Sequence, residues 1–188
     1  AKSNYNSRQK ELSTYPCKRI IESLSDYTKG SIVILTGGEP MERNDILELI
    51  KFGTEKEMKM VMATCGYLIS KDNIRDIKDS GMQAFSFSLD FANPKKHDKF
   101  RNLIGAHKLT THAIELARRN GIRFQINTTV SRANINELES IGKMAEEMGA
   151  SCFNPFILVP VGRAGKLKDL VLEPDQYEEL LNKLCTLK

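Results

Sequence analysis

The stretch that decides the fold joins a short apolar run to a glycine turn: Ser31-Ile32-Val33-Ile34-Leu35-Thr36-Gly37-Gly38-Glu39-Pro40. The first half is β-branched and bounded by glycine, a pattern typical of a buried strand. The second half ends the strand, and Pro40 suits the first turn of a helix. Apolar residues then recur at helical spacing and are expected to face inward: Ile46, Leu47, Leu49, Ile50 and Phe52. The stretch therefore predicts a strand–turn–helix unit.

The same unit recurs along the chain. Strand patterns also occur at 58–63, 83–89, 122–130 and 151–159. Helical patterns occur at 7–28, 70–80, a long region ending at 120–121, 134–148 and from Pro174 onward. Ser70 is expected to cap the 70–80 helix, and Gly81 to end it. Strands that alternate with helices predict an α/β protein with a parallel sheet.

Two architectures fit this alternation, a doubly wound sheet and a barrel or partial barrel. Polar or glycine residues follow all five predicted strands. A doubly wound sheet gathers its site at one crevice, whereas a barrel collects contributions from every strand end. The distribution therefore favours a parallel (βα) partial barrel of about five units.

Composition narrows the class of protein. With 188 residues, the chain is expected to form one domain, 1–188. Its 28 basic and 24 acidic residues give a net charge of +4. The basic residues are interleaved with acidic ones, as in 95–101, so no nucleic-acid partner is expected. No run approaches the roughly 18 apolar residues of a membrane span, and the start lacks a signal-peptide pattern. A cytoplasmic location without membrane contact is therefore expected.

The four cysteines are far apart: Cys17, Cys65, Cys152 and Cys185. No two are separated by the two or three residues of a zinc-ribbon or iron–sulfur run. Free, partly buried thiols are expected, and no residue is assigned as a metal ligand.

The glycine turn is the first candidate site. Gly37 and Gly38 allow a ligand to approach the backbone closely, and Glu39 could accept hydrogen bonds from a ligand ammonium group. The alternative is a plain strand-to-helix turn in which Pro40 begins the helix. No dinucleotide fingerprint of the form G-x-G-x-x-G is present.

Further candidates follow later strands. Ser88 and Asp90 alternate with an apolar residue, so they share a face and suit ribose hydroxyls; the alternative is that Ser88 faces a helix layer and Asp90 caps the next segment. Gln125 and Asn127 also share a face and need partners, from a ligand or from a neighbouring strand. Thr64 is either a ligand contact or a turn residue.

No catalytic histidine motif is visible. The three histidines are His97, His107 and His112, and the last two are expected at exposed helix positions.

Five motifs in order resemble the radical S-adenosylmethionine (SAM) enzymes: Leu35-Thr36-Gly37-Gly38-Glu39-Pro40, Thr64-Cys65-Gly66, Ser86-Phe87-Ser88-Leu89-Asp90 with His97-Asp98 and Arg101 beyond, Gln125-Ile126-Asn127, and Leu158-Val159-Pro160-Val161-Gly162-Arg163-Ala164. The nearest group is the cofactor-maturation branch, which includes the pyrroloquinoline-quinone synthesis enzyme, the molybdenum-cofactor cyclase, and enzymes that modify haem or peptides. The resemblance covers about residues 31–165.

The resemblance implies a role for each matched position. Gly38 and Glu39 would bind the amino group of SAM, Ser88 its ribose or carboxylate, and Asn127 its ribose, while the backbone near Val159 would lie against adenine. The whole set expected at the cofactor is Gly37, Gly38, Glu39, Pro40, Ser88, Asp90, Asn127 and Val159. The residues expected nearer the substrate are Thr64, Gln125 and Arg163.

The chain also departs from the family. The C-x-x-x-C-x-x-C run that holds a [4Fe–4S] cluster is absent, as is a C-terminal cysteine-rich extension. The expectation is a core that lacks the first strand, which leaves the Ile32–Leu35 strand exposed on one side. Alone, this core is expected to hold no cluster and to be inactive. The full-length parent would cleave SAM reductively to a 5′-deoxyadenosyl radical. The 158–164 string favours the quinone, haem and peptide group, with a cofactor precursor or a peptide as substrate.

Two other readings remain open. The chain could be a cluster-less binding or interaction protein on the same scaffold. It could also be an unrelated α/β-barrel enzyme such as an aldolase, which predicts a strand-end lysine or paired carboxylates; only Glu39 and Asp90 are found, on separate strands. Unpaired strand edges of a partial barrel predict a possible dimer.

Overall fold

The structure is a computed structural model that describes residues 11–186, with no side-chain description for Arg163 and Thr186. Five strands form one parallel sheet in the order β1-β2-β3-β4-β5. Their bounds are β1 Ile32–Leu35, β2 Lys59–Thr64, β3 Ala84–Ser88, β4 Arg123–Val130 and β5 Phe153–Ile157. The order follows the sequence and never reverses. A doubly wound sheet needs a reversal, so the partial barrel is confirmed.

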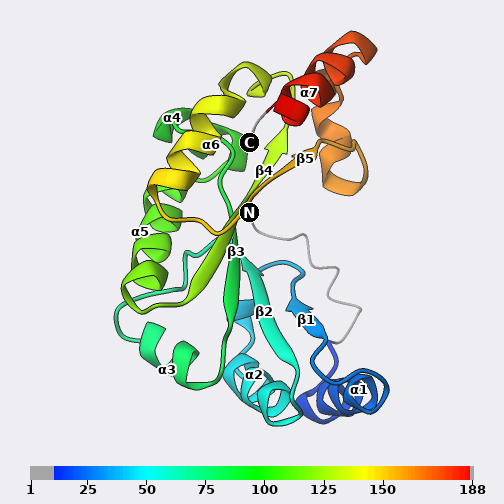
Figure 1. Cartoon of the computed structure of the whole chain (residues 1–188), viewed down its shortest axis with the longest axis vertical. Helices are drawn as coiled ribbons and strands as arrows, with labels where there is room; N and C mark the ends of the chain where they lie inside the picture. The colour runs from blue at the N-terminus through cyan, green and yellow to red at the C-terminus, as the bar shows by residue number, and fades with distance from the viewer. Residues whose placement is uncertain (1–10, 187–188) are drawn as a thin grey trace.

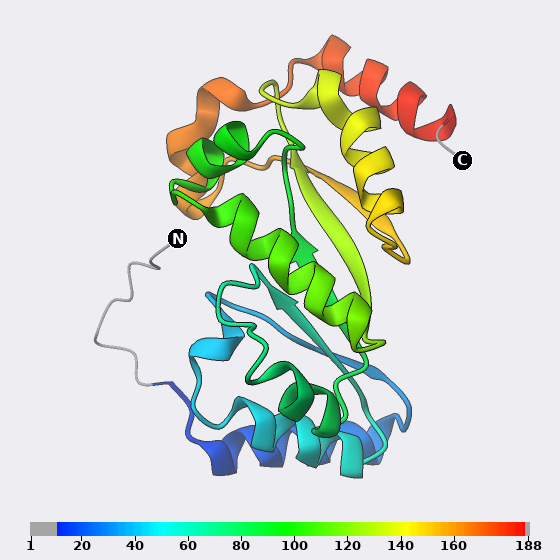
Figure 2. The same cartoon turned by 90° about the vertical axis from the view of Figure 1, so that its left-hand side faces the viewer.

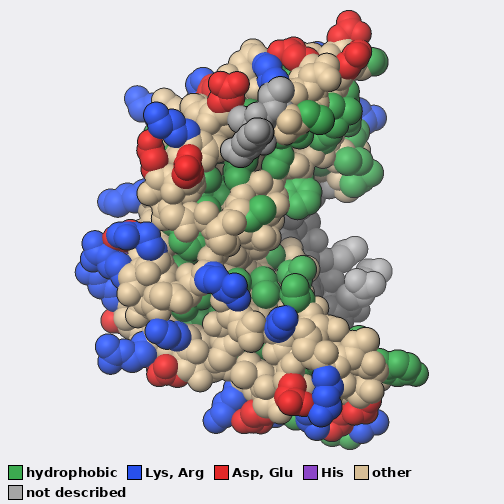
Figure 3. All heavy atoms as spheres, viewed as in Figure 1, with side chains coloured by type: hydrophobic (Ala, Val, Ile, Leu, Met, Phe, Trp, Pro, Cys, Tyr) green, Lys and Arg blue, Asp and Glu red, His purple; other side chains and the backbone are tan. Residues whose placement is uncertain are grey.

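Helices connect the strands. The α-helices are α1 Thr14–Tyr27, α2 Ile46–Glu55, α3 Ile74–Asp79, α4 Pro94–Arg101, α5 Ala106–Arg119, α6 Leu138–Glu147 and α7 Pro174–Thr186. Three 3₁₀ segments complete the set: η1 Pro40–Glu42, η2 Ile135–Glu137 and η3 Gly162–Leu170. Figure 1 shows the connecting helices on one side of the sheet, and Figure 2 shows α5 and α6 in front of the strands. On the other, open side of the sheet, the surface is hollowed between the two ends of the molecule (Figure 3).

The two faces of the sheet differ in chemistry because side chains alternate along each strand. The helix-facing side holds the core, with fully buried Met60, Met62, Phe85, Phe87 and Ile126. A smaller cluster near α7 contains Val130, Leu138 and Leu180. The open side carries polar residues along β3, β4 and β5: Ser86, Ser88, Gln125, Asn127 and Asn154.

The apolar run of β1 indicates a buried strand, but β1 is exposed on one side, as expected for a strand that lacks a neighbour there. Ile32 and Ile34 are 62% and 58% exposed, because β1 is an edge of the described sheet and these side chains face its open side. Val33 and Leu35, which point the other way, pack against the core.

The long helical region before Asn120 is two helices. Asn102 has a left-handed backbone (φ 51°) that ends α4. The carboxylate of Asp98 accepts hydrogen bonds from the backbone nitrogens of Gly105 (2.6 Å) and His107 (2.9 Å) and so caps α5. This places His107 in a partly buried position, and its predicted exposure is wrong.

Other boundaries shift by a few residues. The regular helix after β2 begins at Ile74, although Ser70 does accept a hydrogen bond in the turn before it. Part of the loop expected at 160–165 is the start of η3. The predicted residues 7–10 of the first helix lie outside the described part. Within 11–186, no helix is long and apolar enough to cross a membrane.

Candidate functional site

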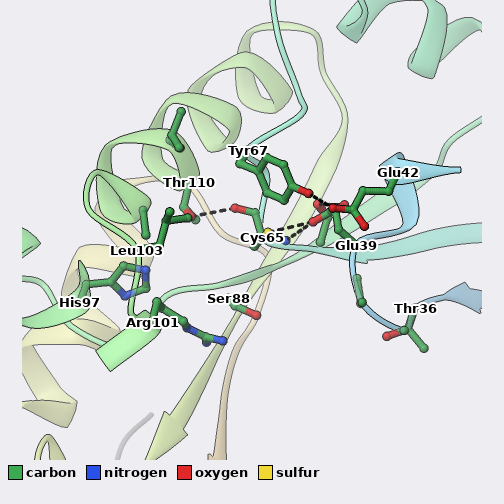
Figure 4. A pocket seen from close by; sticks show the side chains of 16 residues that line it. Thr36, Glu39, Glu42, Cys65, Tyr67, Ser88, His97, Arg101, Leu103 and Thr110 are labelled. Atoms are coloured by element: carbon green, nitrogen blue, oxygen red, sulfur yellow. Dashed lines mark hydrogen bonds between the residues drawn. The ribbon is translucent and has the colours of Figure 1, made fainter. Parts of the chain in front are cut away.

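A cavity of about 250 Å³ lies at the carboxyl ends of β1, β2 and β3, against α4 and α5 (Figure 4). Its lining residues include Gly37, Gly38, Glu39, Thr64, Cys65, Ser88, His97, Arg101, Leu103 and Thr110. The structure thus brings together predicted residues from three strand ends. This is the edge at which parallel α/β sheets place their sites.

Glu39 is the most constrained polar group of the cavity. Its Oε1 accepts hydrogen bonds from Thr64 Oγ1 (2.7 Å) and Met41 N (3.3 Å). Its Oε2 accepts from Cys65 N (3.0 Å) and Cys65 Sγ (2.9 Å). The side chain is 8% exposed, so these four donors replace water around a buried carboxylate.

The turn after β2 holds these donors in place. Thr64 Oγ1 accepts from Gly66 N (2.9 Å), which aims its proton at Glu39. Thr110 of α5 donates to the carbonyl of Cys65 (2.8 Å). A Cβ at Gly66 would lie 2.7 Å from Ala113 Cβ, so only glycine lets α5 pack this close. Burial, followed by the contact with Glu39, raises the pKa of the Cys65 thiol to about 12, and the thiol is therefore protonated.

The glycine turn agrees with both predictions made from its sequence, a plain strand-to-helix turn and a backbone that a ligand can approach. Glu39 caps η1 and the buried Pro40 begins it, as in a plain strand-to-helix turn. Gly37 has a φ of 140°, where a side chain is strained, and a Cβ there would meet nothing within 4 Å. Its backbone is therefore open to the cavity as well. Across the turn, Tyr67 donates a hydrogen bond to Glu42, and both line the cavity.

Asp90 lies behind the cavity wall. It is 0% exposed, and Arg101 Nε (2.5 Å) and Thr129 N (2.9 Å) donate to its carboxylate. Arg101 lines the cavity, whereas Asp90 does not (Figure 4). The structure therefore places Asp90 where it orients Arg101.

His97, like Arg101, lines the cavity but is not among the site residues predicted from the sequence. Its Nδ1 accepts from Asp90 N (3.1 Å), and its side chain is 1% exposed. Burial lowers the pKa of His97 to about 4, with Arg101 and His107 acting in the same direction. A neutral imidazole is the acceptor that this backbone N–H requires. Neither His97 nor Arg101 lies at a strand end, the signal on which the sequence prediction depends.

The remaining predicted residues lie outside this cavity. Gln125 Nε2 donates to Ser86 Oγ (3.1 Å), and Asn154 Nδ2 donates to Asn127 Oδ1 (3.1 Å), both on the open face of the sheet. Asn127 is nevertheless in register with Ser88, which does line the cavity. Val159 follows β5 and is 58% exposed. The side chain of Arg163 lies outside the described part of the structure.

The described residues do not form a metal site. Within 11–186, no three His, Cys, Asp or Glu side chains are grouped to hold a metal ion. The four cysteines are free: Cys17 and Cys65 are partly buried, and Cys152 and Cys185 are exposed. These residues therefore do not fit an iron–sulfur cluster. An amino-acid ligand fits better, because the cavity pairs a buried carboxylate with an arginine.

Comparison with known proteins gives a family. The family model described as the radical SAM superfamily matches residues 2–145. The AdoMet-dependent heme synthase of Nitratidesulfovibrio vulgaris is 41% identical over 172 residues, 92% of this chain and 47% of that protein. The PqqA peptide cyclase of Granulibacter bethesdensis is 27% identical, over 62% of this chain and 31% of that protein. The chain thus spans half or less of the length of these curated relatives.

A solved structure agrees with the fold. SuiB of Streptococcus suis, bound to S-adenosylmethionine, superposes with a TM-score of 0.76 at 18% identity, over 95% of this chain and 42% of that one. Radical SAM proteins are enzymes that use SAM and a [4Fe–4S] cluster, and the named relatives act in haem, cofactor and peptide maturation, as the resemblance implies. The family model covers most of the chain, and a relative that is 41% identical matches 92% of it, so the chain belongs to the radical SAM superfamily.

Proposed function

We propose that this chain binds SAM in the cavity between Glu39 and Arg101, as the core of an enzyme that cleaves SAM reductively to mature a tetrapyrrole. One observation carries the proposal: a buried carboxylate and an arginine line one cavity from opposite sides (Figure 4). An amino acid carries an ammonium and a carboxylate on one carbon, so it complements this pair.

Each cavity residue has a defined task in this proposal. Glu39 accepts a hydrogen bond from the ammonium of the methionine moiety. Arg101 has only its Nε engaged by Asp90, so its terminal nitrogens are available for the ligand carboxylate. Ser88 and, on the next strand, Asn127 address the ribose. The backbone of Gly37 and Gly38 forms the floor at which the ligand approaches most closely.

The described residues position SAM and exclude water, and they assign no general acid or base. In a whole enzyme of this family, residues outside the described part would hold a [4Fe–4S] cluster, which would supply the electron for reductive cleavage of SAM. The ligands of such a cluster are not among the described residues.

A tetrapyrrole is the substrate class that the relatives favour. The heme synthase is 41% identical over nearly the whole chain, against 27% over a shorter part for the peptide cyclase. We place this substrate on the open side of the sheet, where Gln125 presents its amide beside the SAM cavity. The cytoplasmic location and the possible dimer through strand edges stay predictions.

Calorimetric titration of the chain with SAM tests the binding proposal. We expect Glu39→Gln to weaken SAM about tenfold or more, because a hydrogen bond to a charged group contributes about 1.5–3 kcal/mol. Glu139→Gln, at an exposed position of α6, is the matched control and should bind like the parent.

A second experiment tests the activity. The whole protein, reconstituted anaerobically with iron and sulfide, should release 5′-deoxyadenosine from SAM with dithionite, and less with Glu39→Gln. SAM binding without any cleavage by the reconstituted whole protein would contradict the enzyme and leave a binding protein on this scaffold.

A further inference from the structure

The four hydrogen bonds to Glu39 raise a problem for the proposed function. A carboxylate has about four acceptor positions, two on each oxygen. Met41 N and Thr64 Oγ1 occupy Oε1, and the amide and thiol of Cys65 occupy Oε2. The carboxylate is thus fully used before a ligand arrives. An ammonium can bind Glu39 only if one of these donors withdraws.

Three of the four donors are held in place: two are backbone amides, and the third is a hydroxyl with a second hydrogen bond. The amides of Met41 and Cys65 belong to η1 and to the turn after β2, and Thr110 fixes the Cys65 peptide through its carbonyl. The hydroxyl of Thr64 is fixed because it also accepts from Gly66 N.

The thiol of Cys65 differs from the other donors. It is the weakest donor of the four, and rotation about one side-chain bond removes it from Glu39. It lines the same cavity as Glu39, so the space it would leave is the space a ligand enters (Figure 4). The backbone of Tyr67 also forms a hydrogen bond with the sulfur, and rotation of the thiol would give up that bond together with the one to Glu39.

We propose that the Cys65 thiol is a displaceable substitute for the ligand ammonium: it satisfies Oε2 of Glu39 in the empty cavity and swings away when an amino-acid ligand binds. The inference rests on the proposed function and extends it, since Cys65 becomes the residue that sets the affinity for the amino-acid end of SAM. It is a positioning residue, because it acts through Glu39.

The inference predicts a graded series at position 65. Cys65→Ala removes the competing donor, and we expect the dissociation constant for SAM to fall about three- to tenfold. Cys65→Ser supplies a stronger donor to the carboxylate, and the dissociation constant should rise about threefold. SAM should therefore bind most tightly to Cys65→Ala, less tightly to the parent chain and least tightly to Cys65→Ser.

Two measurements separate this effect from a general change in the cavity. The first is titration of each variant with 5′-methylthioadenosine, which has the adenosine and the sulfur but no amino-acid end; its affinity should be the same for all variants. The second is the thermal unfolding temperature, which confirms that each variant is folded. Cys185→Ala, an exposed cysteine on α7, is the matched control.

Each result decides a different question. If the parent chain binds SAM but Cys65→Ala and Cys65→Ser bind it equally well, the inference is wrong and the proposed function stands. The inference is also wrong if SAM and 5′-methylthioadenosine change in parallel, since Cys65 then acts on the cavity as a whole. If the parent chain binds neither compound, the proposed function fails and takes the inference with it.

Discussion

Two carboxylates follow strands of this sheet, and the structure uses them in opposite ways. Glu39 comes after β1 and Asp90 after β3. Glu39 faces the cavity and receives only neutral donors: two amides, a hydroxyl and a thiol. Asp90 is completely buried and is paired with a cation, the guanidinium of Arg101.

The difference shows that the protein partners of a carboxylate decide whether its charge remains available to a ligand. Neutral donors solvate Glu39 without cancelling its charge, so it can still attract a cationic ligand. The charge of Asp90 is already balanced by Arg101, so its effect on a ligand is indirect. We therefore expect Glu39, whose protein partners are neutral, to contact a ligand directly, and Asp90 to act only through Arg101.

The largest expected effect is a difference in the free energy of unfolding between variants of Asp90 and of Glu39. Asp90→Ala should lower the free energy of unfolding by about 3 kcal/mol, because it leaves buried donors and the charge of Arg101 without a partner. Glu39→Ala should cost less, since water in the cavity can reach the freed donors. Urea unfolding of both variants checks this, and equal losses would remove the distinction.

The second effect is a dependence of stability on pH. His97 has a pKa of about 4 in the folded chain and an ordinary value near 6.5, so protonation favours the unfolded state. Stability is then fully present above pH 6.5 and is lost as the pH falls toward 4, by about 2 kcal/mol between pH 7 and pH 5. Unfolding at both pH values measures the loss. In His97→Asn the loss should largely disappear; an unchanged loss would point to another group.

A third test concerns the geometry of the cation. Arg101→Lys keeps a positive charge near Asp90 but loses the planar fork that can bind two groups at once. We expect SAM affinity to fall about tenfold while 5′-methylthioadenosine binds as before. Calorimetric titration measures both. A loss for both compounds would place Arg101 at the nucleoside instead.

The smallest expected effect is a change in SAM affinity after substitution of Ser88. Ser88 lines the cavity at the end of β3 and is in register with Asn127. Ser88→Ala removes one neutral hydrogen bond, so SAM affinity should fall about threefold with little change in stability. Titration and thermal unfolding check the two parts. No change in affinity would restrict the ligand to the side of the cavity near Glu39.

Much of the fold follows from local pattern in the sequence. All five strands lie where alternation or apolar runs predict them, and the polar residues after them indicate the barrel-like edge. The break between α4 and α5 is not predicted, because Asn102 takes a left-handed backbone that apolar periodicity does not reveal. The exposure of Ile32 and Ile34 agrees with the expected lack of a strand beside β1, whereas the apolar run alone indicates a buried strand, since an edge strand and a central strand have the same composition.

The site is predictable only where it is built from strand ends. Gly37, Gly38, Glu39, Thr64 and Ser88 meet at one cavity as expected. The burial of Asp90 depends on Arg101, which arrives from a helix eleven residues later. The direction in which that helix returns is a tertiary property, and strand alternation does not encode it.

The alternation of the sheet also constrains how such a chain can change in evolution. One face of β3 and β4 packs apolar side chains against helices, and the other presents amides and hydroxyls. Inserting a single residue within β3 or β4 would exchange the two faces from that point onward. Insertions and deletions are therefore tolerated in the loops beyond the strand ends, and new substrates are acquired by changing those loops while the strand lengths are inherited unchanged.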